Sequence, residues 1–206
     1  MVISAMPIGE YDRRLEILTT DFGRISAFAR GARKPSSKLV ACTRVFAFGE
    51  FSLYQGRDSF SVNSANIINY FEELSHDFEA NCYGSYFLEL ARFFTRENLN
   101  GEDILKLLYQ SLRALSVESL DMHLVKSIYE IKMIVVNGIY REPDKSLLSE
   151  PVSYAIDYVV SSSIEKLYTF KLTEECLLEF EKIASNMIKS VTHTEFKSLK
   201  LLEGLN

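Results

Sequence analysis

The sequence predicts an α+β protein in which a small β-barrel is followed by an all-helical domain. In residues 2–64, apolar and polar side chains alternate and turn residues recur at short intervals, which is typical of closely spaced strands. From residue 83 onward, apolar residues recur every three or four positions, the period of amphipathic helices. A chain of 206 residues holds one large domain or two small ones. We therefore expect a barrel domain over residues 1–78 and a helical domain over residues 79–206.

Alternation and turn signals predict the barrel strands. They cover residues 14–19, 24–30, 45–54 and 59–63. In the first of these, Leu15 and Ile17 share one face. Gly49 interrupts the long third strand, which indicates a bulge or a bend. Residues 55–58 form a turn before the last strand.

Helical spacing begins near Ile67 and dominates later. The predicted helices cover residues 83–94, 100–115, 120–136 and 173–188. Asn100 and Thr173 are N-cap residues followed by acidic side chains, and Asn137-Gly138 is a C-cap signal. Residues 143–151 form a short polar connection, after which helical character resumes near residue 152.

The composition indicates an ordinary soluble protein, with 47% apolar and 25% charged residues. Its three cysteines, Cys42, Cys82 and Cys176, are far apart and include no Cys-x-x-Cys pair. This spacing predicts neither a disulfide framework nor a metal site, and it suits a reducing cytoplasm. We see no signal peptide and no apolar run near the ~18 residues that a membrane span requires. We therefore expect a cytoplasmic protein without membrane contact.

The stretch from Arg24 to Gly49 carries six cations and no carboxylate. The formal net charge of the whole chain is −5, so the residues outside this stretch carry a net charge of −11. Because the net charge already favours solubility, a local positive field indicates an anionic ligand. If residues 24–30 form a strand, Arg24, Phe28 and Arg30 share one face, so cations flank an exposed aromatic ring. Single-stranded nucleic acid binds such surfaces; the alternative is a basic loop on a barrel with no ligand.

No catalytic constellation is evident. His76, His123 and His193 are far apart, and no phosphate-binding glycine loop is present. Ser85 has no base beside it in the sequence. We therefore predict no enzymatic activity, no catalytic residue and no cofactor.

Three blocks, residues 8–13, 20–25 and 29–34, resemble in order and spacing the N-terminal domain of the bacterial recombination mediator family RecO. Residues 46–54 and 83–90 extend the resemblance, which continues to residues 163–170 and 196–199. The resemblance implies an OB-fold barrel, a helical domain and no covalent catalysis. It also implies a nucleoid-associated DNA repair and recombination protein that binds single- and double-stranded DNA and anneals complementary strands. The implied partners are RecR, with which it helps load the recombinase at gaps, and the C-terminal tail of single-strand-binding protein.

By this resemblance, the DNA-binding residues fall on the barrel. They are Arg13, Arg14, Arg24, Phe28, Arg30, Arg33, Lys34, Lys38 and Arg44. Phe28 is the candidate stacking residue, unless the strand register is shifted by one and places it in the core. Arg13 has an alternative role in an ion pair with Glu10 or Asp12. In the helical domain, cations available for an acidic tail are Arg92, Lys126 and Lys132.

The sequence departs from the family pattern in two places. Family members commonly carry a four-cysteine zinc finger, whereas residues 143–151 stand at that point and contain no cysteine. We therefore predict no structural zinc. Residues 2–5 also leave little chain for a first strand, so we expect either that the barrel is short at that edge or that the chain starts late.

Two alternative functions belong to other classes. In the first, the chain is an adaptor whose acidic helical domain docks RecR or single-strand-binding protein, while the barrel has little DNA affinity of its own. The charge of −11 outside the basic stretch is consistent with this alternative. The second, a zinc-dependent nucleic-acid enzyme, requires ligands that the sequence lacks.

Overall fold

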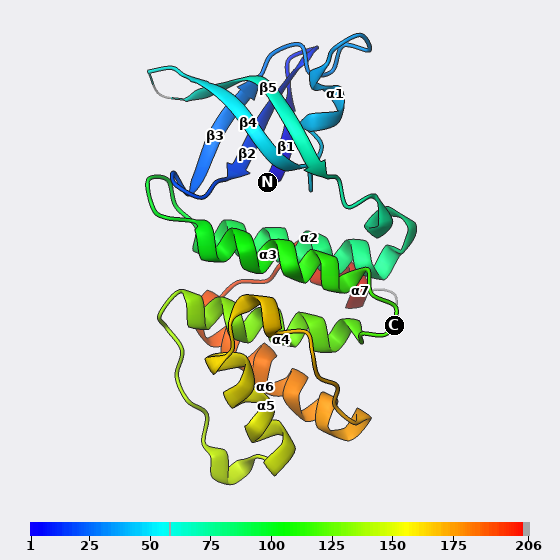
Figure 1. Cartoon of the computed structure of the whole chain (residues 1–206), viewed down its shortest axis with the longest axis vertical. Coiled ribbons are helices and arrows are strands. Elements are labelled where there is room, and N and C mark those ends of the chain that lie inside the picture. The colour runs from blue at the N-terminus through cyan, green and yellow to red at the C-terminus, as the bar shows by residue number, and fades with distance from the viewer. Residues whose placement is uncertain (58, 204–206) are drawn as a thin grey trace. The chain divides into compact units, whose positions relative to one another are not determined.

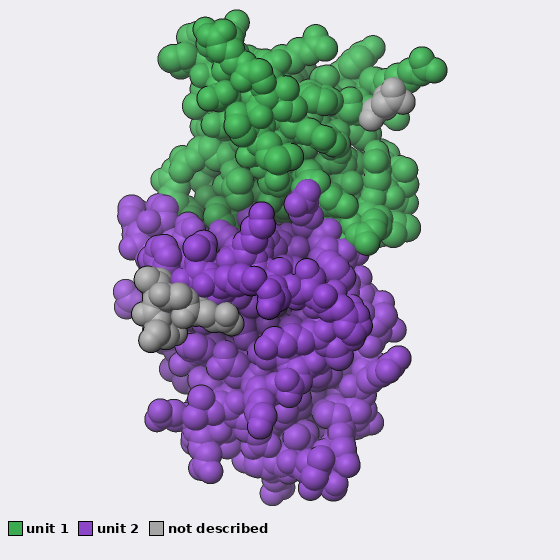
Figure 2. All heavy atoms as spheres, turned by 180° about the vertical axis from the view of Figure 1, so that it is seen from behind, with its two compact units in different colours: residues 1–72, 95–105 green, residues 73–94, 106–206 purple. Residues whose placement is uncertain are grey.

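The computed structural model describes residues 1–57 and 59–203. It divides into two compact units, coloured separately in Figure 2. Unit 1 comprises residues 1–72 and 95–105, and unit 2 comprises residues 73–94 and 106–206. The division of the chain into domains over residues 1–78 and 79–206 remains our prediction.

Unit 1 is built on a five-stranded sheet (Figure 1). Its strands are β1 (Val2–Ile8), β2 (Asp12–Leu18), β3 (Arg24–Ala29), β4 (Phe48–Gln55) and β5 (Phe60–Asn69), with the short helix α1 (Leu39–Cys42) between β3 and β4. The spatial order is β1-β2-β3-β5-β4, and only the β3–β5 pair among these ladders is parallel.

The two edges of this sheet meet just before β4. The Val2 N–H donates to the Ala47 carbonyl at 2.9 Å, and the Phe46 N–H donates to the Val2 carbonyl at 3.0 Å. A five-stranded, partly open barrel of this kind is the OB-fold. The predicted fold class, an OB-fold barrel followed by a helical domain, is therefore confirmed.

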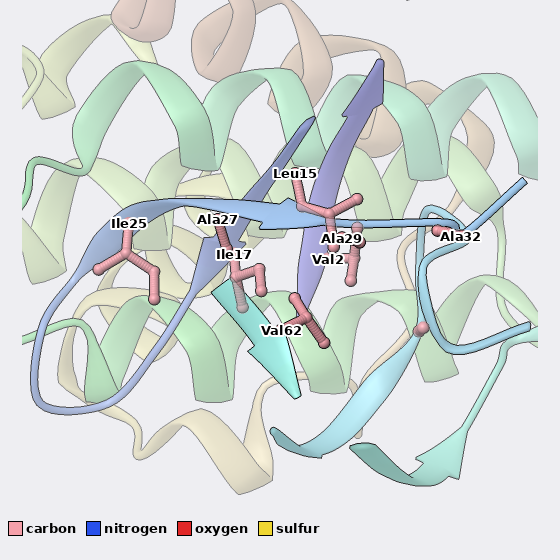
Figure 3. Packing of buried hydrophobic residues seen from close by; sticks show 9 residues of the cluster. Val2, Leu15, Ile17, Ile25, Ala27, Ala29, Ala32 and Val62 are labelled. Carbon is pink, nitrogen blue, oxygen red and sulfur yellow. The ribbon is translucent and has the colours of Figure 1, made fainter. Parts of the chain in front are cut away.

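The barrel core comes from alternation along each strand. In β3, every second residue is buried, so Ile25, Ala27 and Ala29 point inward. Phe28 lies between two of them in the strand and is therefore on the outer face. Figure 3 shows side chains from β1, β2, β3 and β5 directed toward this shared interior. The register that we expected for β3 is confirmed, and the alternative that places Phe28 in the core is wrong.

Two strands are longer than the sequence indicated. The first strand was expected to be short, but β1 has seven residues, because an edge strand tolerates Pro7, which lacks an N–H. Helical spacing was expected from Ile67, but β5 continues to Asn69. Ile67 packs on the core and Ile68 is 64% exposed, which is the alternation of a strand.

The third predicted strand begins later than expected. Phe46 has φ of 73°, a conformation outside the β region, so β4 starts at Phe48 instead of residue 45. The predicted bulge is confirmed, since the β4–β5 register shifts between Phe48 and Gly49. A Cβ on Gly49 would lie 2.1 Å from the Asn66 carbonyl oxygen, which explains the glycine. The predicted turn after β4 ends at Asp58, which lies outside the described residues.

The helical part of the chain contains six α-helices within the described residues. They are α2 (Phe78–Phe94), α3 (Glu102–Leu115), α4 (Met122–Val136), α5 (Glu150–Ser161), α6 (Glu174–Thr192) and α7 (Lys197–Glu203), with single 3₁₀ turns η1 (Glu72–His76), η2 (Lys145–Leu147) and η3 (Ile164–Lys166). Helix α4 is the most buried and packs against α2, α5 and α6.

The predicted helix caps are confirmed, whereas α2 begins at Phe78, before the expected residue 83, and α6 continues to Thr192, beyond the expected residue 188. The Asn100 side chain accepts a hydrogen bond from the Glu102 N–H, and Thr173 accepts one from the Cys176 N–H. Gly138 follows α4 with φ of 68°, the left-handed conformation of a C-terminal cap. None of the helices within residues 1–57 and 59–203 is long and apolar enough to span a bilayer.

Candidate nucleic-acid interface

Three arginines line one cavity of about 340 Å³ on unit 1. They are Arg13 on β2, Arg33 in the loop after β3, and Arg44 just after α1. The described residues that complete its wall, Ala5, Pro7, Thr43 and Val45, bring no carboxylate. Guanidinium groups bind phosphate oxygens in a bidentate manner, so the cavity has the chemistry of a phosphate site.

Arg13 connects β2 with the end of α1. Its Nη1 donates to the Thr43 side-chain oxygen at 2.9 Å and to the Thr43 carbonyl at 3.1 Å. Asp12, one of the ion-pair partners considered for Arg13, instead accepts the Gly31 N–H at 2.7 Å. Arg13 therefore has a structural role at the cavity, which leaves only part of its guanidinium for a ligand.

The loop that carries Arg33 is fastened to the turn between β1 and β2. The Arg33 N–H donates to the Tyr11 carbonyl at 2.8 Å, and its side chain donates to the Gly9 carbonyl at 3.3 Å. The Lys34 ammonium lies 5.3 Å from the centre of the Tyr11 ring, a cation–π contact. Tyr11 and Thr43 are supporting residues that the sequence did not indicate, because their partners lie far along the chain.

A second group of predicted residues lies on the outer face of the sheet. Arg14 on β2 is directly opposite Phe28 on β3, and its Nε donates to the Ser26 side chain at 3.0 Å. Phe28 is partly exposed. A cation and an aromatic ring therefore lie side by side on one surface, although the cations that the sequence placed beside Phe28 were Arg24 and Arg30.

Arg24 lies on the same face but has a partner. Its Nη1 is 2.7 Å from Glu16 Oε1, and the two side chains are only 23% and 13% exposed. Its Nε also donates to the Thr95 carbonyl at 3.4 Å. A cation in a partly buried ion pair has less capacity for a phosphate, so Arg24 is the weakest of the predicted contacts.

The remaining predicted cations are exposed. These are Arg30, Arg33, Lys34, Lys38 and Arg44. Arg44 Nη1 lies 4.0 Å from Glu72 Oε1, and both side chains are more than half exposed, so this contact is weak. The structure thus brings Arg13, Arg33 and Arg44 together at the cavity, places Arg14 and Phe28 on the sheet, and does not join all nine residues in one site.

Unit 2 has a larger cavity of about 830 Å³. Lys126 lies in its wall, with apolar groups that include Ile188 and Leu199. Lys126 Nζ is 3.4 Å from a carboxylate oxygen of Glu130 and also 3.4 Å from one of Glu181. Burial raises the pKa of the Glu130 carboxyl, and the neighbouring Lys126 ammonium opposes this rise.

The other two cations considered for the helical domain are elsewhere. Lys132 is buried on α4, and its ammonium donates to three carbonyl oxygens at the end of α5. Arg92 is exposed on α2 and is not in the wall of this cavity. Within the described residues, no group of three or more His, Cys, Asp or Glu side chains is placed to hold a metal ion. The absence of zinc stays a prediction.

Comparison with known proteins accounts for both parts of the chain. A family model described as Recombination protein O N terminal matches residues 1–71, and one described as Recombination protein O C terminal matches residues 75–146. The chain is 27% identical to DNA repair protein RecO of Acetivibrio thermocellus, across 100% of this chain and 95% of that protein. It is 34% identical to the RecO of Caldicellulosiruptor bescii, across 68% of this chain and 57% of that protein. It is 30% identical to a RecO of Listeria monocytogenes, across 79% and 64% of the two chains. Because the two family models match in order within residues 1–146 and relatives at least 30% identical cover more than two thirds of the chain, this protein belongs to the RecO family.

Proposed function

We propose that this chain is a DNA repair accessory protein that binds single- and double-stranded DNA through unit 1. The relatives described above are named DNA repair proteins, which supports a repair role. The observation that carries the proposal is the cavity lined by Arg13, Arg33 and Arg44, because three arginines line it and the other described residues of its wall bring no carboxylate. The proposed role involves no covalent chemistry.

Binding of this kind rests on the release of counterions from the DNA backbone. Arginine contacts to phosphate carry no sequence information, so the protein would bind strands of any sequence. Neutralising two complementary strands at once lowers their mutual repulsion. We therefore propose that the protein anneals complementary strands and, at the nucleoid, helps RecR load the recombinase at gaps.

A second candidate, the protein-interaction adaptor, is favoured by the cavity in unit 2. An acidic tail with an apolar end needs an apolar wall beside a cation. Lys189 lies in the wall of this cavity with Ile188 and Leu199. Lys126 also lies in this wall, but it is already paired with Glu130 and Glu181. We propose that the C-terminal tail of single-strand-binding protein and RecR are partners of this chain, whichever of the two functions holds.

The test is fluorescence-anisotropy binding to a labelled single strand at several salt concentrations. The variant is Arg33→Gln/Arg44→Gln, which removes two cavity cations and spares Arg13, whose hydrogen bonds support α1. The matched control is Lys171→Gln/Lys182→Gln, two exposed lysines of unit 2.

The cavity variant should lose about 1.4 units of the log–log salt slope, at about 0.7 for each phosphate contact on a single strand. The control should keep the wild-type slope. If the cavity variant keeps the wild-type slope as well, the DNA lies elsewhere. If the wild type binds only after RecR is added, the adaptor function replaces the DNA-binding one.

A further inference from the structure

We infer that the outer face of the unit 1 sheet is a stacking platform for single-stranded nucleic acid, in which Tyr54 stacks on bases together with Phe28. This inference rests on the proposed function, since it assumes that unit 1 binds DNA. It adds that this face distinguishes a single strand from a duplex, and it assigns a role to Tyr54, which is 73% exposed on β4.

One residue from each strand contributes to a single row across the sheet. The row is Met6, Arg14, Phe28, Ser61 and Tyr54, in spatial order. Each member is the direct cross-strand partner of the next. Directly paired residues have their side chains on the same face of a sheet, so these five side chains lie side by side.

Burial shows which face this is. Leu15 follows Arg14 in β2, and Ala27 precedes Phe28 in β3. Both side chains are 0% exposed and belong to the barrel core. Since neighbouring residues in a strand point to opposite faces, the row lies on the outside of the barrel. Met6, near one end of the row, is 46% exposed.

A single exposed aromatic residue is common and by itself indicates nothing. The row differs from a single exposed aromatic residue because three of its members, Met6, Phe28 and Tyr54, carry large apolar groups. The residues between them, Arg14 and Ser61, are cationic and small. Ser61 separates the two rings, and Arg14 lies next to Phe28, held by the Ser26 hydroxyl at 3.0 Å. An aromatic ring beside a guanidinium offers a base a stacking surface and its phosphate a counter-charge.

The spacing of the row suits a strand with separated bases. Adjacent strands of a sheet lie about 4.8 Å apart, so the rings of Phe28 and Tyr54, two strands apart, are separated by about 10 Å. That is about three times the 3.4 Å rise of one strand in a duplex. A single strand crossing the β-strands can therefore place on the two rings bases that are not direct stacking neighbours, with other nucleotides between them.

The charges around the row favour nucleic acid as its occupant. The row itself contains a cation and no carboxylate. Asp12 and Glu16 lie on the same face of β2 as Arg14. Both are already bonded within unit 1, Asp12 to the Gly31 N–H and Glu16 to Arg24. Arg30 follows the end of β3, and Arg57 lies in the turn that follows β4; both are exposed. In a duplex the bases are stacked and paired within the helix, so only its phosphates reach these groups. The rings therefore add affinity for a single strand and none for a duplex.

The test compares Tyr54→Leu and Phe28→Leu with the wild type, using a labelled single strand, the same sequence as a duplex, and an abasic strand of equal length. Leucine keeps an apolar side chain and removes the ring. The matched control is Tyr154→Leu, because Tyr154 on α5 has the same exposed fraction, 73%, as Tyr54. Thermal melting of each variant checks that the barrel remains folded.

Each ring variant should weaken single-strand binding by about 5- to 150-fold, the range of 1–3 kcal/mol per stacked base. Duplex affinity and the salt slope should not change. The wild type should bind the abasic strand more weakly than either single ring variant binds the normal strand, because an abasic strand loses the stacking contacts with both rings. Equal loss for strand and duplex would overturn the inference. The inference would also be overturned if Tyr54→Leu bound the single strand with the affinity of the wild type. In that case, a lower salt slope in Arg33→Gln/Arg44→Gln would leave the proposed function in place. If the wild type binds neither strand nor duplex, both fail together.

Discussion

Replacing Lys132 with Met tests whether this buried lysine holds two helices together. Lys132 lies on α4 and is only 6% exposed. Its ammonium donates to the carbonyl oxygens of Val159 and Val160 at 3.1 Å and of Ser162 at 2.6 Å. The last four carbonyls of a helix have no partner within it. Lys132 therefore caps α5 from a neighbouring helix, although the sequence suggested it as a cation for an acidic tail.

The size of the effect follows from these contacts. A hydrogen bond to a charged group contributes about 1.5–3 kcal/mol, so three such bonds sum to about 4.5–9 kcal/mol. Burying the ammonium costs several kcal/mol in return, and Met restores most of the apolar stem. We therefore expect Lys132→Met to lower the free energy of unfolding by about 2–4 kcal/mol.

Urea denaturation followed by circular dichroism measures this difference. The control is Lys182→Met, because Lys182 is exposed on α6; it should lie within about 0.5 kcal/mol of the wild type. If Lys132→Met is as stable as the control, the ammonium does not hold α5 and the capping argument is wrong. A variant that is fully stable but loses binding of an acidic peptide would restore the ligand role.

Three further predictions follow from ion pairs and metal ligands. Glu16→Gln removes the partner of Arg24, so the DNA-binding salt slope should steepen by up to about 0.7; a shallower slope would contradict this. The pKa of His123 is raised in the folded protein, chiefly by its hydrogen bond with Glu181. The pair therefore stabilises the fold fully below about pH 6.5, the ordinary pKa of histidine. This stabilisation is lost as the pH rises through the raised pKa of the folded state. His123→Gln should therefore lower the free energy of unfolding by less than about 1 kcal/mol near pH 6 and by a smaller amount near pH 8. Urea titrations at the two pH values measure this difference, and equal losses at both would refute the pairing. Metal analysis of the purified protein should find far less than one zinc per chain, because no described group of three ligands is placed for one; a stoichiometric amount would show that the prediction is wrong.

The parts of the fold that the sequence predicted correctly are those determined by near neighbours. The alternation that buries Ile25 and exposes Phe28 follows from strand geometry alone. The caps at Asn100 and Thr173 bond to N–H groups two or three residues away. The extent of β5 was missed because Ile67 and Ile68, adjacent and both β-branched, fit the start of a helix pattern as well as a strand. Pairing with β4 decides between them, and that partner is not visible in a local pattern.

The same distinction applies to the basic residues. A sequence shows which side chains are cationic, but it does not show which of them the fold already uses. Arg24 pairs with Glu16 on the neighbouring strand, and Arg13 bonds to Thr43, thirty residues away. Eight predicted cations would give a salt slope of up to about 5.6 in magnitude, whereas six, without Arg13 and Arg24, give about 4.2 at 0.7 for each phosphate. A measured slope nearer the smaller value would show that cations bonded within the protein contribute little to counterion release, so binding depends on the cations that the fold leaves available.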